Sequence, residues 1–360
     1  MFTDVTIQNL RSLDNKNIQP KPGINIITGA NGSGKTSLLE ALYIITHGRS
    51  FRYREAAPLI REGTTEYILI AKFSSNHQTE HTIGIQRSKT DIKVRLDRKP
   101  LGRRSEIVHL LPVLCIDSEV QLLMTGGPEL RRNFLDAGMF HMEPQYLMYY
   151  QQYHRALEQR NAALKSRQPV LSGWEEIMQQ AAEKIDSWRQ DYSAKLTQLV
   201  QHYMHEWQMD IELDIQYQRG WNKEINLIEA LYKAYDTDIK MKYTSVGPHR
   251  ADIVIRNQQT KSAKRLSRGQ MKMVACALYF AQAILFRKQQ QRNIILLFDD
   301  LSAELDNKNK GYLLQNIKKI FSQTFITVLN EQDITCITDV QHVFHMEHNF
   351  IDRSNLHKAI

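Results

Sequence analysis

Residues 24–36 read INIITGANGSGKT and connect an apolar run to a helical pattern through a glycine-rich loop. The loop contains the Walker A pattern Gly-x-x-x-x-Gly-Lys-Ser/Thr. Its glycines let backbone N–H groups point inward around phosphate oxygens, and the following helix adds the positive end of its dipole. A flexible glycine–serine turn is the alternative. The apolar run before the loop, and the helical period at Leu38, Leu39 and Leu42 after it, favour a phosphate loop.

The chemistry of this loop assigns roles to its residues. Lys35 can place its charge against the β- and γ-phosphates of a nucleotide, which makes it a catalytic candidate, and the Thr36 hydroxyl can ligate Mg²⁺. We therefore predict ATP and Mg²⁺ as cofactors. The predicted nucleotide-binding residues of the loop are Gly29, Ala30, Asn31, Gly32, Ser33, Gly34, Lys35, Thr36 and Ser37.

A second apolar run, Ile294 to Phe298, ends in Asp299 and Asp300. A buried parallel strand has this composition, and ligands bind at the carboxyl ends of such strands. We expect Asp299 to hold Mg²⁺ and Asp300 to be the catalytic residue that orients or deprotonates the attacking water. A strand that ends in a polar turn is the alternative.

Residues 266–270, LSRGQ, precede an apolar helical run from Met273 to Phe286. Ser267 is a good N-cap, Gly269 permits close backbone approach, and the helix N-terminus favours an anion. Taken alone, the segment is best explained as a capped helix. Its position between the phosphate loop and the paired aspartates favours a nucleotide contact instead.

The composition is that of a soluble folded protein with two or three domains, since 42% of the 360 residues are hydrophobic and 24% are charged. Cys115, Cys276 and Cys336 have no metal or disulfide spacing, so we predict a reducing compartment. The first residues lack signal-peptide features, and the apolar runs are too short to span a bilayer. We predict a cytoplasmic protein without a membrane partner.

The formal net charge of +8 suits a polyanion such as DNA, although solvated lysine faces give the same balance. The first helix is followed by a segment of basic and aromatic residues. This segment could contact DNA, or it could be a structural link that packs behind the nucleotide. Its DNA-binding candidates are Arg49, Arg52 and Arg54. Two weaker basic clusters are Arg98, Lys99, Arg103 and Arg104, and then Lys261, Lys264, Arg265 and Arg268.

The middle of the chain is helical. Apolar residues recur at spacings of three and four from Trp174 to Trp207, which predicts one helix of roughly 35 residues. Because the phosphate loop and the paired aspartates must meet, we interpret the helical middle as an insertion. The predicted domains are an ATPase head made of residues 1–110 and 241–360, and a mainly helical arm at residues 111–240.

The three motifs, in this order, resemble those of the ABC-type ATPase heads, including the SMC-like repair proteins. The resemblance implies an α/β P-loop ATPase head with an inserted helical arm. In that superfamily the signature motif of one subunit covers the ATP held by another subunit. It therefore implies an ATP-dependent homodimer in which Ser267, Gly269 and Gln270 act in trans. Residues 302–306 look like the D-loop of these ATPases.

Four longer blocks, residues 31–43, 48–52, 127–136 and 244–252, resemble the RecF family of bacterial recombination mediators. The resemblance implies a weak DNA-dependent ATPase that acts as a switch. It also implies binding to gapped DNA, where single and double strands meet, and loading of RecA with RecO and RecR. The sequence departs from the family pattern at Arg268, where Gln is usual, and at Ser37, where Asn is common.

Other functions fit less well. A transporter ATPase usually has Glu and a switch His where Asp300 and Thr327 stand. An SMC head with a long arm needs a longer insertion, and a clamp that does not hydrolyse ATP does not need the paired aspartates. His249 and Arg250 could form a catalytic pair, but a structural turn in which Arg250 holds a carboxylate is favoured.

Overall fold

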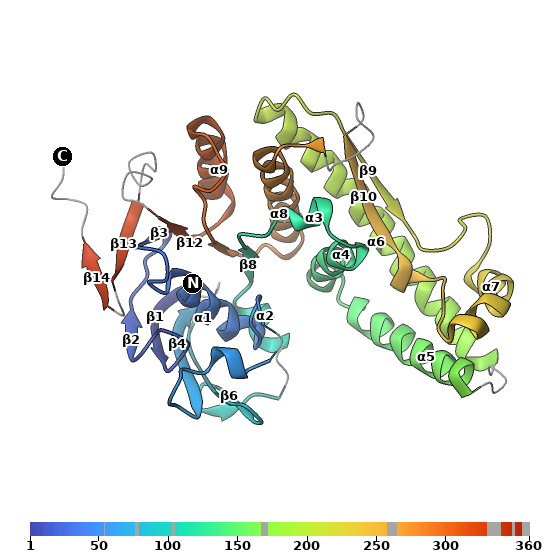
Figure 1. Ribbon diagram of the computed structural model, residues 1–360, viewed down its shortest axis with the longest axis horizontal. Coiled ribbons are helices and arrows are strands. Elements are labelled where there is room, and N and C mark those ends of the chain that lie inside the picture. The colour runs from blue at the N-terminus through green and yellow to red at the C-terminus, as the bar shows by residue number, and fades with distance from the viewer. Residues whose placement is uncertain are drawn as a thin grey trace. The chain divides into compact units, whose positions relative to one another are not determined.

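The computed structural model describes residues 1–53, 55–75, 79–102, 105–166, 172–257, 265–329, 340–347 and 350–354. The chain forms two compact units. The first comprises Met1–Val120 and Gln291–Ile360, and the second comprises Gln121–Gln290. Figure 1 shows the elements of both along the chain.

The first unit contains a six-stranded sheet whose strands are parallel except at one edge. Its order is β14-β13-β3-β12-β11-β8, and only β14 runs antiparallel to its neighbour. The strands are β3 (Gly23–Thr28), β8 (Val113–Ile116), β11 (Ile295–Phe298), β12 (Gln323–Val328), β13 (Val340–Glu347) and β14 (Phe350–Ser354). Because these parallel strands end at the same edge, the loops after β3, β8, β11 and β12 meet there.

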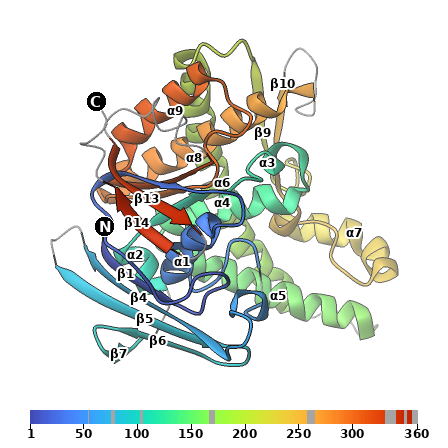
Figure 2. The ribbon, with the colours of Figure 1, turned by 60° about the vertical axis from the view of Figure 1, so that its left-hand side comes forward.

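A second six-stranded sheet in this unit is antiparallel (Figure 2). Its strands, in spatial order, are β2 (Lys16–Ile18), β1 (Phe2–Gln8), β4 (Glu66–Ser74), β5 (Glu80–Ser88), β6 (Ile92–Leu96) and β7 (Lys99–Pro100). Helix α1 (Lys35–His47) contacts strands of both sheets, and one apolar core joins all three. The unit also contains η1 (Ala57–Leu59), α2 (Ser105–Leu110) and α9 (Asn307–Ile320).

The second unit is mainly helical. Its long helix is α6 (Ser172–Glu206), whose 35 residues confirm the length expected from the apolar period. The other elements are α3 (Leu122–Thr125), α4 (Pro128–Met142), α5 (Tyr146–Ser166), β9 (Leu213–Gln218), α7 (Leu227–Met241), η2 (Pro248–Arg250), β10 (Asp252–Asn257) and α8 (Arg268–Gln290).

The predicted arm boundary at residue 240 does not coincide with the end of this unit. β10 pairs along its length with β9, and α8 packs against α4 and α6. These contacts place residues 241–290 in the same compact unit as the helices before them. The division into ATPase head and arm stays a prediction.

Among the described residues, α8 is the one helix long and apolar enough to cross a membrane by length and composition. However, 78% of its most apolar window is buried inside the protein. Its apolar surface therefore serves the core of the second unit, against α4 and α6.

Two of the blocks that resemble the RecF family contact each other in this unit. Arg131 binds the Asp252 carboxylate through two bonds of 2.7 and 2.9 Å, and the buried Arg189 guanidinium binds Asp136 at 2.5 Å and the Pro248 carbonyl at 2.8 Å. Among the described residues Arg250 forms no ion pair, so the expectation that it holds a carboxylate is wrong; Arg131 holds the Asp252 carboxylate. The Arg250 guanidinium instead lies 4.9 Å from the centre of the Tyr243 ring. The two blocks thus stabilise the fold of the second unit.

His249 lies in the turn of η2, within the second of these blocks. Its Nε2 lies 2.9 Å from the Thr244 carbonyl, so this nitrogen carries the proton and donates it, while Nδ1 accepts from the Tyr153 hydroxyl at 2.7 Å. Burial lowers the pKa of His249 to about 4, and the Arg250 and Arg132 cations act in the same direction. The His249 ring is therefore neutral and hydrogen-bonded through both nitrogens, which supports a structural role for this turn.

We expect His249 to make the second unit sensitive to acid. The unfolded chain binds this proton below its ordinary pKa of 6.5, whereas the folded chain binds it only near pH 4. Stability is therefore lost as the pH falls through this window, by about 2 kcal/mol at about pH 5. The free energy of unfolding in urea can be measured at about pH 5 and at about pH 7.5. Its decrease on going to the lower pH should be about 2 kcal/mol smaller for His249→Gln than for the wild type. An identical loss in both proteins would contradict this assignment.

Candidate nucleotide site

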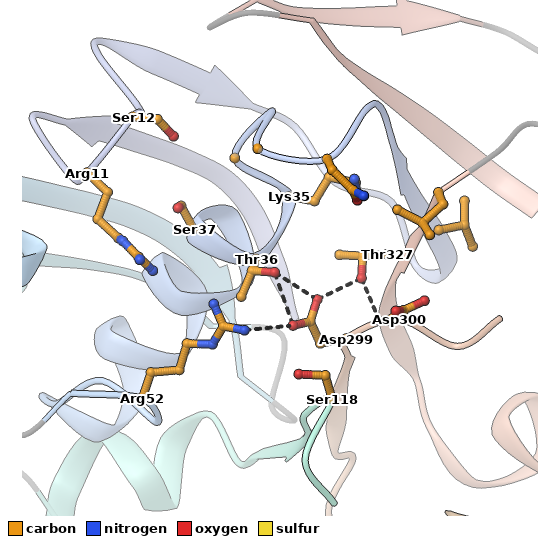
Figure 3. Close-up of a pocket in the computed structure, with 15 residues that line it drawn as sticks. Arg11, Ser12, Lys35, Thr36, Ser37, Arg52, Ser118, Asp299, Asp300 and Thr327 are labelled. Carbon is orange, nitrogen blue, oxygen red and sulfur yellow. Dashed lines mark hydrogen bonds and ion pairs between the residues drawn. The ribbon is translucent and has the colours of Figure 1, made fainter. Parts of the chain in front are cut away.

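The loops at the carboxyl edge of the parallel sheet enclose a pocket of about 430 Å³ (Figure 3). Both predicted halves of the site contribute to it, the phosphate loop after β3 and the paired aspartates after β11. The lining residues are Arg11, Ser12, Asn31, Gly32, Gly34, Lys35, Thr36, Ser37, Arg52, Ser118, Asp299, Asp300, Thr327, Val328 and Leu329.

Two glycines of the phosphate loop are required by backbone geometry. Gly29 has φ of 149°, and a Cβ atom there would lie 2.2 Å from the Met346 carbonyl oxygen. Gly34 has φ of 102°, and its Cβ would lie 3.0 Å from the Ser12 hydroxyl. A side chain at Gly29 would therefore collide with backbone, and both positions would be strained by any other residue. The loop leaves its own backbone, rather than side chains, to face a ligand.

Lys35 folds back over the phosphate loop. Its ammonium group donates to the carbonyls of Gly29 at 2.6 Å and Ala30 at 2.9 Å. Burial lowers the pKa of Lys35, and the carboxylates of Asp300 and Asp299 oppose that shift. Two carbonyls of the loop thus hold the Lys35 cation beside the loop.

The Asp299 carboxylate is bound from two sides. The Thr36 hydroxyl lies 3.1 Å from each of its oxygens, and the Thr327 hydroxyl donates to Oδ1 at 2.8 Å. Thr327 in turn accepts the backbone N–H of Asp300 at 2.7 Å. Asp300 has φ of 56°, an uncommon left-handed conformation that a residue other than glycine adopts at some cost in free energy.

The donor set fits Mg²⁺. Thr36 and Asp299 offer hydroxyl and carboxylate oxygens, the ligands that this hard cation prefers. Within the described ranges, no group of three or more His, Cys, Asp or Glu side chains could hold a metal.

The phosphate loop also fits a polyanion. The Ser33 hydroxyl is buried and has no hydrogen-bond partner among the described residues. A Cβ built at Gly32 meets nothing within 4 Å, so the loop has open space at this residue. A buried hydroxyl without a partner costs free energy, which a phosphate oxygen would recover.

The predicted signature residues lie at the start of α8 in the second unit. Ser267 and Gln270 form a reciprocal cap: the Ser267 N–H donates to Gln270 Oε1 at 2.9 Å, and the Gln270 N–H donates to Ser267 Oγ at 3.2 Å. This confirms Ser267 as the N-cap. Ser267 is exposed, and Gly269 and Gln270 are half-buried. Their action on a second subunit's nucleotide stays a prediction.

The three DNA-binding candidates have different surroundings. Arg49 is exposed. Arg52 lines the pocket, with its guanidinium 4.0 Å from Asp299, which favours the alternative of a link behind the nucleotide. Arg54 lies outside the described residues, as do Arg103, Arg104, Lys261 and Lys264 of the weaker clusters.

Several lining residues were not predicted from sequence. Ser118 follows β8, and Thr327 to Leu329 lie at the carboxyl end of β12. Polar residues at the carboxyl ends of apolar strands were a usable signal for Ser118 and Thr327. Arg11 and Ser12 come from the turn between β1 and β2, in the antiparallel sheet. Nothing in the sequence indicates that this turn reaches the phosphate loop.

Comparisons with known proteins agree with this geometry. The family model described as RecF/RecN/SMC N terminal domain matches residues 1–352. A protein named DNA replication and repair protein RecF from Citrobacter koseri is 36% identical over 94% of this chain and 95% of its own. A protein of the same name from Salmonella typhimurium is 35% identical over the same shares.

Solved structures show the same fold. A structure of the recombination mediator protein RecF with ATP superposes with a TM-score of 0.86 at 24% identity, over 98% of this chain and 97% of that one. An SMC head bound to the C-terminal winged-helix domain of ScpA gives 0.60 at 16% identity, over 99% and 98%. The predicted α/β ATPase head of the ABC/SMC type is therefore confirmed.

We expect Thr327→Val to disturb both aspartates. The change keeps the side-chain shape but removes the hydroxyl that donates to Asp299 and accepts from the N–H of Asp300. The free energy of unfolding in urea should fall by about 1–3 kcal/mol, because two polar partners lose a buried bond. Thr327→Ser should restore most of it. Equal stability of the Val and Ser variants would show that the hydroxyl contributes nothing.

Proposed function

The chain belongs to the family of RecF, RecN and SMC N-terminal domains, and we propose that it is an ATP-dependent DNA-binding protein of recombinational repair. The observation that carries the proposal is the pocket in which Lys35 and Thr36 of the phosphate loop meet Asp299. Relatives named DNA replication and repair protein RecF over nearly the whole chain support the assignment to repair.

Four side chains of the pocket have roles in this proposal. Lys35 and the amides of the phosphate loop bind the nucleotide phosphates. Thr36 and Asp299 hold Mg²⁺, which supplies positive charge where negative charge develops during phosphoryl transfer. Asp300 orients and polarises the attacking water and accepts its proton. Because Asp is shorter than Glu, we expect slow hydrolysis, suited to a switch rather than a motor.

The proposed switch requires a second copy of the chain. Ser267, Gly269 and Gln270 of one subunit would contact the nucleotide in the other, so that ATP joins two heads. The exposure of Ser267 at the capped end of α8, with Gly269 and Gln270 half-buried beside it, supports such a contact. ATP can drive dimerisation only by as much as it binds the dimer more tightly than the monomer. Hydrolysis then resets the dimer.

We further propose gapped DNA at single-strand/double-strand junctions as the substrate, with RecO and RecR as partners in loading RecA in the cytoplasm. The net charge of +8 supports a polyanionic partner. The solved RecF structures are described as belonging to the RecFOR pathway, which supports the choice of partners.

Lys35→Arg should weaken ATP-dependent dimerisation and retention on DNA, each by about tenfold or more. Lys35 is largely buried against two carbonyls, where the planar guanidinium of Arg does not replace an ammonium group. Sedimentation velocity with and without ATP, repeated with gapped DNA, measures both effects. The exposed Lys72→Arg is the matched control. Wild-type behaviour of Lys35→Arg would reject the proposed function.

A mixture of two inactive variants tests the shared site. Ser267→Arg blocks the trans contact, and Lys35→Arg blocks the phosphate loop. Half of the dimers in an equal mixture carry one of each, with one intact site of two, so about a quarter of wild-type ATPase activity should return. Activity equal to the mean of the separate variants would show that each chain works alone.

A further inference from the structure

Glu40 of α1 is a carboxylate with no exposed surface. It lies one turn after Thr36 and Ser37, on the helix face that these two pocket residues share. A buried carboxylate costs several kcal/mol unless it is paired, and an apolar side chain of similar volume would fill the space as well or better. Packing alone therefore does not explain this residue.

Both partners of Glu40 come from segments that line the pocket. Arg11 Nη1 donates to Oε2 at 2.8 Å, from the turn between β1 and β2. The Ser50 hydroxyl donates to Oε1, from the segment that follows α1. One carboxylate thus connects two segments that are 39 residues apart in sequence (50 − 11) to the helix that begins at the phosphate loop.

The Arg11 turn touches the phosphate loop directly. Leu10 and Leu13 close it with reciprocal backbone bonds of 3.0 and 2.8 Å, and Arg11 has φ of 51°. The Ser12 and Leu13 side chains lie so near Gly34 that a Cβ there would be 3.0 and 3.1 Å from them. The ion pair with Glu40 holds this strained turn against the loop.

The Ser50 segment aims Arg52 into the pocket. The Ser50 hydroxyl accepts the backbone N–H groups of Arg52 at 2.8 Å and of Tyr53 at 2.9 Å. The Arg52 guanidinium then lies 4.0 Å from Asp299, and the Tyr53 ring lies 5.2 Å from the Arg11 guanidinium. The two segments therefore support each other as well as Glu40.

We propose that Glu40 is a positioning residue of the nucleotide site, which holds the cations of Arg11 and Arg52 in the pocket before a nucleotide enters. Arginine side chains lose substantial rotamer entropy when they are fixed, so their prior fixation strengthens binding of a polyanion. The inference rests on the proposed binding of ATP and assigns a part of that site.

The variant Glu40→Gln keeps the volume of the side chain and removes its charge. Affinity for a fluorescent ATP analogue should fall about tenfold, the size expected for a lost charged hydrogen bond. In the background Arg11→Ala/Arg52→Ala, the same change should cost less than about twofold, since the residues through which Glu40 acts are gone. Equal losses in both backgrounds would overturn the proposal.

Hydrogen exchange without nucleotide gives a second readout. The amides of Arg52 and Tyr53, bonded to the Ser50 hydroxyl, should exchange several-fold faster in Glu40→Gln and in Ser50→Ala. Unchanged exchange in both variants would overturn the proposal. Ser50→Ala keeps the test decisive if Glu40→Gln does not fold. Glu66→Gln is the matched control, because Glu66 bonds Gln86 on the antiparallel sheet and does not line the pocket.

The outcomes separate this inference from the proposed function. If the wild type binds the ATP analogue no better than Lys35→Arg, the function itself is rejected. If the wild type binds well, Lys35→Arg binds poorly and Glu40→Gln matches the wild type, only the positioning role of Glu40 is rejected.

Discussion

The Asp299 carboxylate is the group on which the nucleotide site depends. It accepts hydrogen bonds from Thr36, 263 residues earlier, and from Thr327. The backbone N–H of Asp299 donates to the Ile116 carbonyl at 2.8 Å. One residue thus ties the ends of β11, β12 and β8 to the start of α1. Because Asp299 is only 3% exposed, the site contains a buried carboxylate that a cation would stabilise.

The order of strands explains why these groups meet. β12 lies between β3 and β11, and all three are parallel, so the phosphate loop and the aspartates come from the same edge with Thr327 between them. α1 contacts β8, β11 and β12 as well as β4 and β5. The helix that presents Lys35 and Thr36 is therefore anchored in the core of the first unit, and Glu40 extends that anchoring to the two arginine segments.

Uncommon backbone conformations occur around the pocket, as they do elsewhere in the described chain. Gly29 and Gly34 have positive φ, and so do Arg11 and Asp300, which are not glycines. Each is held by specific contacts: Arg11 by Glu40, and Asp300 by the Thr327 hydroxyl. In the second unit the polar network around Arg131 and Arg189 instead fixes the structure without lining the pocket. This difference separates residues that the proposed function uses from residues that preserve the fold.

The sequence by itself determined the features that depend on neighbours a few residues apart. These are the strand, loop and helix around residues 24–36, the length of α6, and the cap at Ser267, since spacings of two, three or four residues encode them. Only the tertiary structure decided that β10 and α8 pack with the second unit, that Arg52 faces Asp299, and that the Arg11 turn lies on the phosphate loop. These contacts join segments dozens to hundreds of residues apart. Their partners are selected by strand order and burial, which no local pattern records.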